Sequence, residues 1–141
     1  MRIDAEILGL PPKKDGANSM WAKEAEVPRL VALRRAVADA VAGRAPLNHQ
    51  VLLELETHLP ECDPRLSGDL DNQITGICDG LMAAHPRIRT HSRWQEPDVA
   101  DISPDRVVGL VDDSKVVEIR ARRVVDASSP WYRLILEGEI I

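Results

Sequence analysis

Aspartates in two distant parts of the chain have the side-chain type and the spacing to hold a divalent metal ion. Asp69 and Asp71 stand two residues apart at the start of an expected helix, and the pair Asp112-Asp113 precedes an expected strand. Short carboxylates are the ligand type that hard cations such as Mg²⁺ prefer, and Mn²⁺ is the natural substitute. If folding brings Asp69, Asp71 and Asp113 together, they repel one another unless a cation lies between them. Such an ion can activate water for phosphodiester hydrolysis.

The same aspartates also have a purely structural interpretation. Asp69 stands where a helix N-cap is expected, and an aspartate there accepts hydrogen bonds from backbone N–H groups without an intrahelical partner. Asp112 and Asp113 would suit a turn, in which aspartate is common. Both interpretations therefore remain open. In the metal interpretation, Asp112 would be an alternative ligand or a group just outside the ligand set.

The helix that must position the first two aspartates is expected between Gly68 and Met82. Its apolar residues recur at helical spacing and form one core-facing stripe: Leu70, Ile74, Ile77, Cys78, Leu81 and Met82. Asp71, Thr75 and Asp79 follow one another at four-residue spacing on the opposite face. We expect Cys78 to be a buried, reduced thiol. Gly76 and Gly80 permit the close approach of another backbone, either from the sheet or from a partner chain.

The hydrophobic pattern along the chain predicts an α+β fold. The 141 residues, 44% of them hydrophobic, suit a single domain spanning 1–141, and its core must be aliphatic because the chain has no Phe and only one Tyr. A helix is expected from Val27 until Gly43, with Arg29, Arg34 and Arg35 on its outer side. Alternating apolar residues predict strands, at residues 2–7, 51–59, 117–122 and 131–141, the last two paired as a hairpin. The order β-α-β-α-β-β indicates a two-layer sandwich, a mixed β-sheet with two main helices on one face.

Two segments carry the basic residues that could contact nucleic acid. An extended loop is expected at about residues 84–106, where Arg87, Arg89, Arg93 and Trp94 precede a run of acidic residues. The basic part could hold a nucleic-acid backbone and stack Trp94 on a base, or the two halves of the loop could neutralise each other. Lys13 and Lys14, after the first strand, are either phosphate contacts or part of a solvated loop.

Composition excludes several other classes of protein. The formal net charge of −5 argues against indiscriminate binding to polyanions, although a local basic patch remains possible. Two cysteines are too few for a disulfide scaffold. The N-terminal residues alternate instead of forming an apolar block, and no run is long enough to span a membrane. A cytoplasmic location is the simplest expectation.

Short motifs across the chain resemble the RusA family of Holliday junction resolvases. These are Asp69-Leu70-Asp71-Asn72, then Asp79-Gly80-Leu81, then Val111-Asp112-Asp113 before a Val-rich strand, together with Pro11-Pro12 and Asn18 near the start. The resemblance extends over nearly the whole chain in the order of its elements. It implies a homodimeric, magnesium-dependent endonuclease that cuts four-way DNA junctions symmetrically, with Asp69, Asp71 and Asp113 holding the metal. Asn72 would contact DNA or orient a ligand, or serve only in the first turn of the helix.

The chain departs from the pattern of that family at positions that normally carry positive charge. Thr75 stands where the family usually has a lysine, Ser67-Gly68 replaces basic residues before the first aspartate, and the loop before Asp112 is longer. Lys115 could replace the lysine, because residues two apart on a strand share a face and Lys115 would then point the same way as Asp113. Lys13, Lys14 and the three arginines of the loop could offset the other loss.

Three hypotheses follow. The first is a magnesium-dependent, structure-selective endodeoxyribonuclease of recombination and repair, with Asp69, Asp71, Asp113 and Lys115 in the catalytic site. The second is a module of the same fold that binds junctions without cutting them. The third is a small interaction protein in which every aspartate caps or turns, and it predicts no stabilisation by Mg²⁺.

Overall fold

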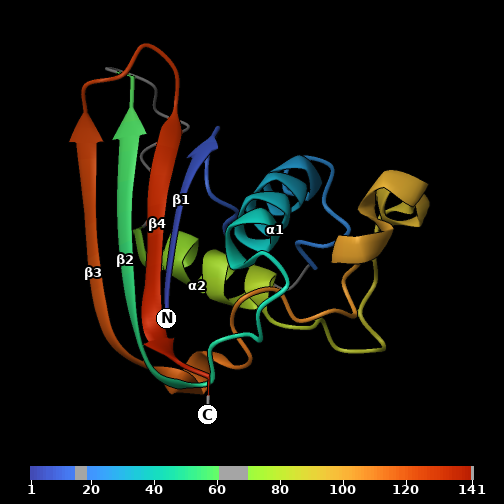
Figure 1. The fold of residues 1–141 in the computed structure, drawn as a ribbon. Helices are drawn as coiled ribbons and strands as arrows, with labels where there is room; N and C mark the ends of the chain where they lie inside the picture. The colour runs from blue at the N-terminus through green and yellow to red at the C-terminus, as the bar shows by residue number, and fades with distance from the viewer. Residues whose placement is uncertain (15–18, 61–69, 141) are drawn as a thin grey trace.

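A four-stranded sheet and two α-helices form the body of the protein in the computed structural model, which describes residues 1–14, 19–60 and 70–140. The elements follow one another as β1 (Arg2–Leu8), α1 (Val27–Val41), β2 (His49–Leu59), α2 (Leu70–Leu81), β3 (Val116–Val125) and β4 (Trp131–Glu139). The predicted α+β class, the mixed sheet and the order β-α-β-α-β-β are confirmed. Figure 1 shows the strands side by side, with both helices packed beside the sheet.

The predicted hairpin between the last two strands is wrong. The strand order is β1-β4-β2-β3, so β2 lies between β3 and β4. It pairs with β3 in parallel and with β4 in antiparallel register, placing Leu55 opposite both Ala121 and Leu134. The apolar residues of β2 are suited to a central position. β3 carries three arginines, which are better tolerated at the edge of a sheet.

The core between sheet and helices is mainly aliphatic, as predicted. The alternation in β1 places Ile3, Ala5 and Ile7 inward, and α1 contributes Leu33 and Val37. Pro28 lies in the first turn of α1, and the helix ends where Ala42 and Gly43 adopt left-handed backbone conformations, with φ of 52° and 77°. Cys78 is buried and unoxidised, which confirms its predicted state.

The two glycines of α2 admit other parts of the same chain. A Cβ atom on Gly76 would overlap the carbonyl group of Pro12, and one on Gly80 would lie 2.8 Å from a methyl group of Leu30. The sequence left two partners open for these glycines, the sheet or a partner chain, and the structure shows a different one. The close approach is made by the segment after β1 and by α1, so these glycines fix the loop after β1 against α2.

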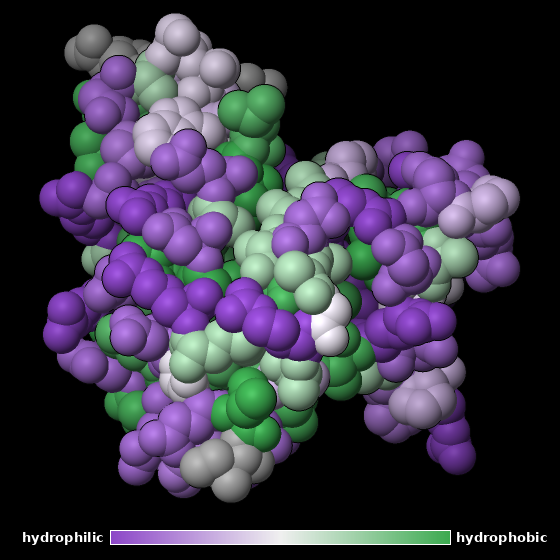
Figure 2. Space-filling model, viewed as in Figure 1, coloured by the Kyte–Doolittle hydropathy of each residue, from purple (hydrophilic) through white to green (hydrophobic). Residues whose placement is uncertain are grey.

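The segment expected as an extended loop contains short helical turns. Ser92–Gln95 and Pro97–Ile102 form the 3₁₀ helices η2 and η3, which lie on the opposite side of α1 from the sheet (Figure 1). Trp94 is buried there against Trp21, with ring centroids 5.5 Å apart. The outer surface of this lobe is largely hydrophilic (Figure 2). Because its ring is buried, Trp94 is unavailable for the predicted stacking on a base.

Arg34 was predicted on the outer side of α1 and is instead fully buried. Its guanidinium donates hydrogen bonds to five carbonyl oxygens, those of Gly80 (2.6 Å), Met82 (3.3 Å), Ile102 (2.8 Å), Ser103 (2.7 Å) and Arg106 (2.6 Å). The carbonyls at the end of α2 have no partner within their own helix. Burial lowers the pKa of Arg34 to about 10, so the side chain remains charged at neutral pH. It joins α1 to the end of α2 and to the segment before β3.

Candidate functional site

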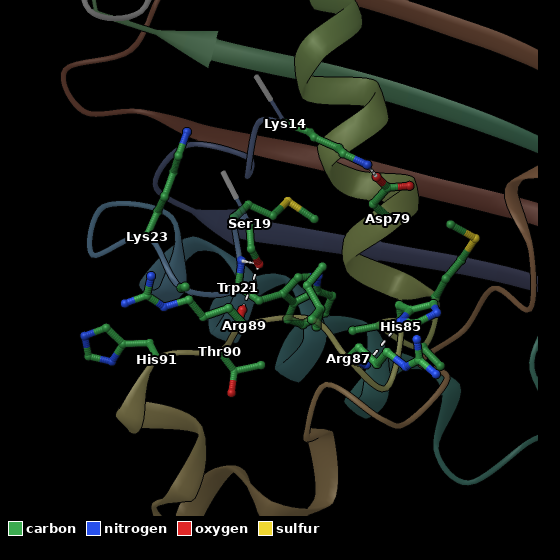
Figure 3. Close-up of a pocket in the computed structure, with 16 residues that line it drawn as sticks. Lys14, Ser19, Trp21, Lys23, Asp79, His85, Arg87, Arg89, Thr90 and His91 are labelled. Atoms are coloured by element: carbon green, nitrogen blue, oxygen red, sulfur yellow. Dashed lines mark hydrogen bonds and ion pairs between the residues drawn. The ribbon is translucent and has the colours of Figure 1, made fainter. Parts of the chain in front are cut away.

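A cleft of about 1030 Å³ separates residues 19–23 from residues 82–91 (Figure 3). Four cationic side chains line it: Lys14, Lys23, Arg87 and Arg89. His85 and His91 also line the cleft. Among the residues that the structure describes, Asp79 is the one acidic residue in the lining. Positive charge along a cleft attracts anions, phosphate groups among them. We call this feature the basic cleft.

Lys14 connects the basic cleft to α2. Its ammonium group forms an ion pair with Asp79 at 2.7 Å, drawn as a dashed line in Figure 3, while its side chain remains 53% exposed. The backbone N–H of Lys14 donates to the carbonyl oxygen of Asn72 at 3.1 Å. With Pro12 packed on Gly76, these contacts hold the end of the loop on α2. Lys14 is therefore oriented at its backbone but accessible at its charge.

The later aspartate pair lies near the C-terminal half of the same helix. The backbone N–H of Asp113 approaches the sulfur of Met82 at 3.0 Å. Burial, together with the carboxylates of Asp112 and Asp79, raises the pKa of Asp113 above its ordinary value. Hydrogen bonding to Ser114 keeps the pKa of Asp112 low. Burial and the charges of Asp113 and Asp79 raise the pKa of the Cys78 thiol to about 12. Asp79 is thus close enough to Asp113 for its charge to affect that carboxyl group, and we call Asp79, Asp112 and Asp113 the aspartate cluster.

The predicted metal ligands are only partly placed by the structure. Asp69 lies outside the described residues. Asp71 is exposed in the first turn of α2, about 12 Å along the helix axis from Asp79 at 1.5 Å per residue. Within residues 1–14, 19–60 and 70–140, no group of three or more His, Cys, Asp or Glu side chains could hold a metal ion. The set Asp69, Asp71 and Asp113 therefore stays a prediction.

Asp79 is the residue of this region to which the sequence analysis gave no role. It occupies the polar face of α2 two turns after Asp71, and the structure brings it beside both Asp113 and Lys14. The sequence signal that could have identified Asp79 was its position on the helix face that carries Asp71. The position of Asp113 along α2 could not be predicted from the sequence, because it depends on the path of the long segment between α2 and Asp113.

The predicted DNA-binding residues divide into two groups. Lys14, Arg87 and Arg89 line the basic cleft. Lys13 does not, and its backbone N–H donates to Glu26 at 2.8 Å. The guanidinium of Arg93 instead forms two hydrogen bonds of 2.8 Å with Asp98 and contacts Glu96 at 2.7 Å. For Arg93 the structure thus supports the interpretation in which the acidic half of the segment neutralises the basic half.

The predicted alignment of Lys115 with Asp113 along a strand is wrong. Asp113–Lys115 forms the short 3₁₀ helix η4, and β3 begins only at Val116, so strand alternation does not apply to these residues. Lys115 is exposed. The expected apolar side of the following strand is exposed too, with Val117 at 68% and Ile119 at 49%. The helices therefore do not cover this part of β3.

No protein-family model matches this chain, and no curated protein sequence matches it. Among the residues that the structure describes, none of the helices combines the length and the apolar character needed to cross a membrane.

Proposed function

We propose that this protein is a magnesium-dependent, structure-selective endodeoxyribonuclease that resolves four-way DNA junctions, as a homodimer of the RusA type. The observation that carries the proposal is the position of Asp79: it lines the basic cleft together with the cationic side chains, and its charge also acts on Asp113 of the aspartate cluster. A polyanion bound in the cleft would present its phosphates next to carboxylates. Recombination and repair of DNA in the cytoplasm is the corresponding role.

Asp79, Asp112 and Asp113 are not placed to hold a metal ion by themselves, but their negative charge would attract a divalent cation. The raised pKa of Asp113 means that its negative charge is unfavourable beside Asp112 and Asp79, and a bound cation would remove that cost. Asp69, Asp71 and Asp113 would hold the ion, with Asp112 as an alternative ligand. When bound, Mg²⁺ or Mn²⁺ supplies an activated water and offsets charge on the phosphate.

The other residues of the site would bind and orient the DNA. Lys14, Arg87 and Arg89 would hold backbone phosphates, and Asn72 would contact DNA or orient a ligand from the first turn of α2. Lys115 keeps its proposed place near the scissile phosphate, now on the turn that also carries Asp113. Lys115→Ala should then slow cleavage, and a wild-type rate would remove Lys115 from the proposal.

A second function is favoured by one specific observation. The backbone of Asp113 contacts the sulfur of Met82, just past the C-terminal end of α2 and far from Asp71 in its first turn, and Lys14 already neutralises Asp79. A site with this arrangement suits a module that binds junctions without cutting them. That alternative keeps the basic cleft and gives up the metal.

A four-way junction with one labelled strand separates the two functions. Incubation with Mg²⁺ and with EDTA, beside a binding measurement on the same junction, gives three readouts. The nuclease requires Mg²⁺-dependent cleavage that leaves 5′-phosphate and 3′-hydroxyl ends. Binding without cleavage supports the module. Neither binding nor cleavage, with no rise in melting temperature on adding Mg²⁺, supports an interaction protein and rejects both.

A further inference from the structure

We propose that the basic cleft accepts a single, unpaired DNA strand, with its phosphates at the exposed cationic side chains and its bases against the apolar side chains of the lining. The proposal rests on the proposed function only in taking DNA as the substrate. It adds that the preferred substrate has unpaired nucleotides next to the branch, instead of four fully paired arms.

Two arginines at the rim of the cleft carry positive charge without a partner in the described part of the chain, and Lys14 adds a charge that it shares with Asp79. Arg87 and Arg89 are exposed, and among the described residues neither guanidinium has an ion-pair or hydrogen-bonding partner. They differ in this from Arg93, which is neutralised by Asp98. Lys14 reaches the same cleft from the opposite segment and is about half exposed. Charges two residues apart on one wall and a third across from them suit successive phosphates of one strand.

Apolar side chains line the cleft beside the cationic ones. Met82, Ala83, Ala84 and Ile88 are among them, and all four are partly or fully exposed to solvent. Duplex DNA hides the faces of its bases in the stack and offers mainly phosphates and sugars to a protein. An unpaired strand offers base faces, which pack on apolar side chains whatever their sequence. A cleft lined by both exposed cations and exposed apolar side chains is therefore complementary to an unpaired strand.

The walls of the basic cleft are tied together before any ligand binds. The hydroxyl of Ser19 donates to the carbonyl oxygen of Arg89 at 2.9 Å, a bond drawn in Figure 3, and the N–H of His91 donates to the carbonyl oxygen of Trp21 at 2.9 Å. Arg34 holds the start of the second wall through the carbonyl oxygens of Gly80 and Met82. A preformed cleft lowers the ordering cost of binding a flexible strand.

The test compares binding of a labelled thymidine oligonucleotide with binding of a duplex of equal length, by fluorescence anisotropy in EDTA. We expect the single strand to bind at least about fivefold more tightly, from the stacking that only unpaired bases offer. Arg87→Gln with Arg89→Gln should weaken single-strand binding at least about tenfold, and lower the slope of log K against log salt by about 1.4, or two contacts at about 0.7 each.

Two further variants separate the apolar contribution from the charge. As a control, Arg2→Gln with Arg120→Gln removes the same charge from exposed arginines of β1 and β3, at 54% and 64% exposure. This variant should leave the salt slope of binding unchanged. Ile88→Thr makes the lining of the cleft more polar and should weaken binding of the single strand while duplex binding stays the same. The inference is overturned if the duplex binds as tightly as the single strand, or if the Arg87 and Arg89 variant binds like the wild type. Because EDTA prevents cleavage, these outcomes are independent of whether the protein proves to be a nuclease.

Discussion

Lys14 and Asp79 face each other at 2.7 Å where the basic cleft meets α2. This ion pair links the loop after β1 to a carboxylate that also raises the pKa of Asp113. The cation of the cleft and the anions of the aspartate cluster are therefore parts of one electrostatic unit. A bound phosphate would share Lys14 with Asp79.

Lys14→Met should weaken DNA binding without unfolding the protein. The side chain is about half exposed, and exposed ion pairs contribute only about 0–1 kcal/mol to stability. The loss of one phosphate contact should lower the salt slope of binding, measured by anisotropy, by about 0.7–0.9. An unchanged slope would place Lys14 outside the DNA interface.

Arg34→Met should strongly destabilise the protein. Five carbonyl groups would lose their donor, those of Gly80 and Ile102 in buried hydrogen bonds and the other three in partly buried ones. Each unsatisfied group costs about 1–3 kcal/mol when it stays dry, so we expect a loss of at least about 3 kcal/mol in urea unfolding. Arg35→Met is the matched control on the neighbouring position, because the exposed pair of Arg35 with Asp101 is worth about 1 kcal/mol or less. Equal effects of the two variants would contradict the role given to Arg34.

Arg34 also shows where sequence periodicity succeeds and where it fails. The spacing of Leu30, Leu33, Val37 and Val41 correctly predicted α1 and its buried stripe. Arg34 stands four residues after Leu30 and three before Val37, so the same spacing places it inside that stripe. It was assigned to the surface because a charged residue is seldom fully buried. Its partners are backbone carbonyls, which the sequence does not reveal.

The sheet shows the same limit. The alternation in β1 and β2 predicted which residues face the core, and the fold class followed from the order of the elements. The pairing of β3 with β2 instead of β4 depends on contacts between strands far apart in the sequence, on which local alternation is silent. The sequence identified the aspartates as possible metal ligands. Their neighbours in space could not be predicted, because they depend on the path of residues 82–112 between α2 and β3.

Gly76→Ala should displace the segment after β1. A methyl group there would meet the backbone of Pro12 and Lys13, which cannot rotate away as a side chain could. Overpacking of this kind costs about 1–3 kcal/mol. Thr75→Ala, at an exposed position one residue earlier, is the control and should change stability by less than about 0.5 kcal/mol. Thermal unfolding measures both, and equal melting temperatures would show that Gly76 is not in tight contact.

His58 should make stability depend on pH. Its ring nitrogens lie 2.8 Å from Asp126 and 2.6 Å from Glu56, and the ring stacks on Trp131. Burial opposes the charge on the imidazole, but the two carboxylates outweigh it and raise its pKa. A raised pKa stabilises the folded state below the unfolded value of about 6.5, and this contribution is lost as the pH rises through the folded value.

His58→Gln should therefore lower the melting temperature more at pH 5.5 than at pH 9. The matched readout is the titration of the His58 ring by NMR, which should give a pKa above the ordinary histidine value. A stability difference that is the same at both pH values, or that grows at high pH, would reject the charged bridge between Glu56 and Asp126.

The most direct test of the proposed activity is the cleavage of a four-way junction by Asp113→Asn and Asp71→Asn in Mg²⁺. If both carboxylates hold the ion, each variant should lose cleavage by at least about 100-fold, the scale of a lost catalytic interaction worth about 3 kcal/mol, while junction binding in EDTA stays within about twofold. The account predicts this separation of cutting from binding, together with loss of the Mg²⁺-induced rise in melting temperature. Wild-type cleavage by Asp113→Asn, or a wild-type protein that binds junctions and never cuts them, would contradict it.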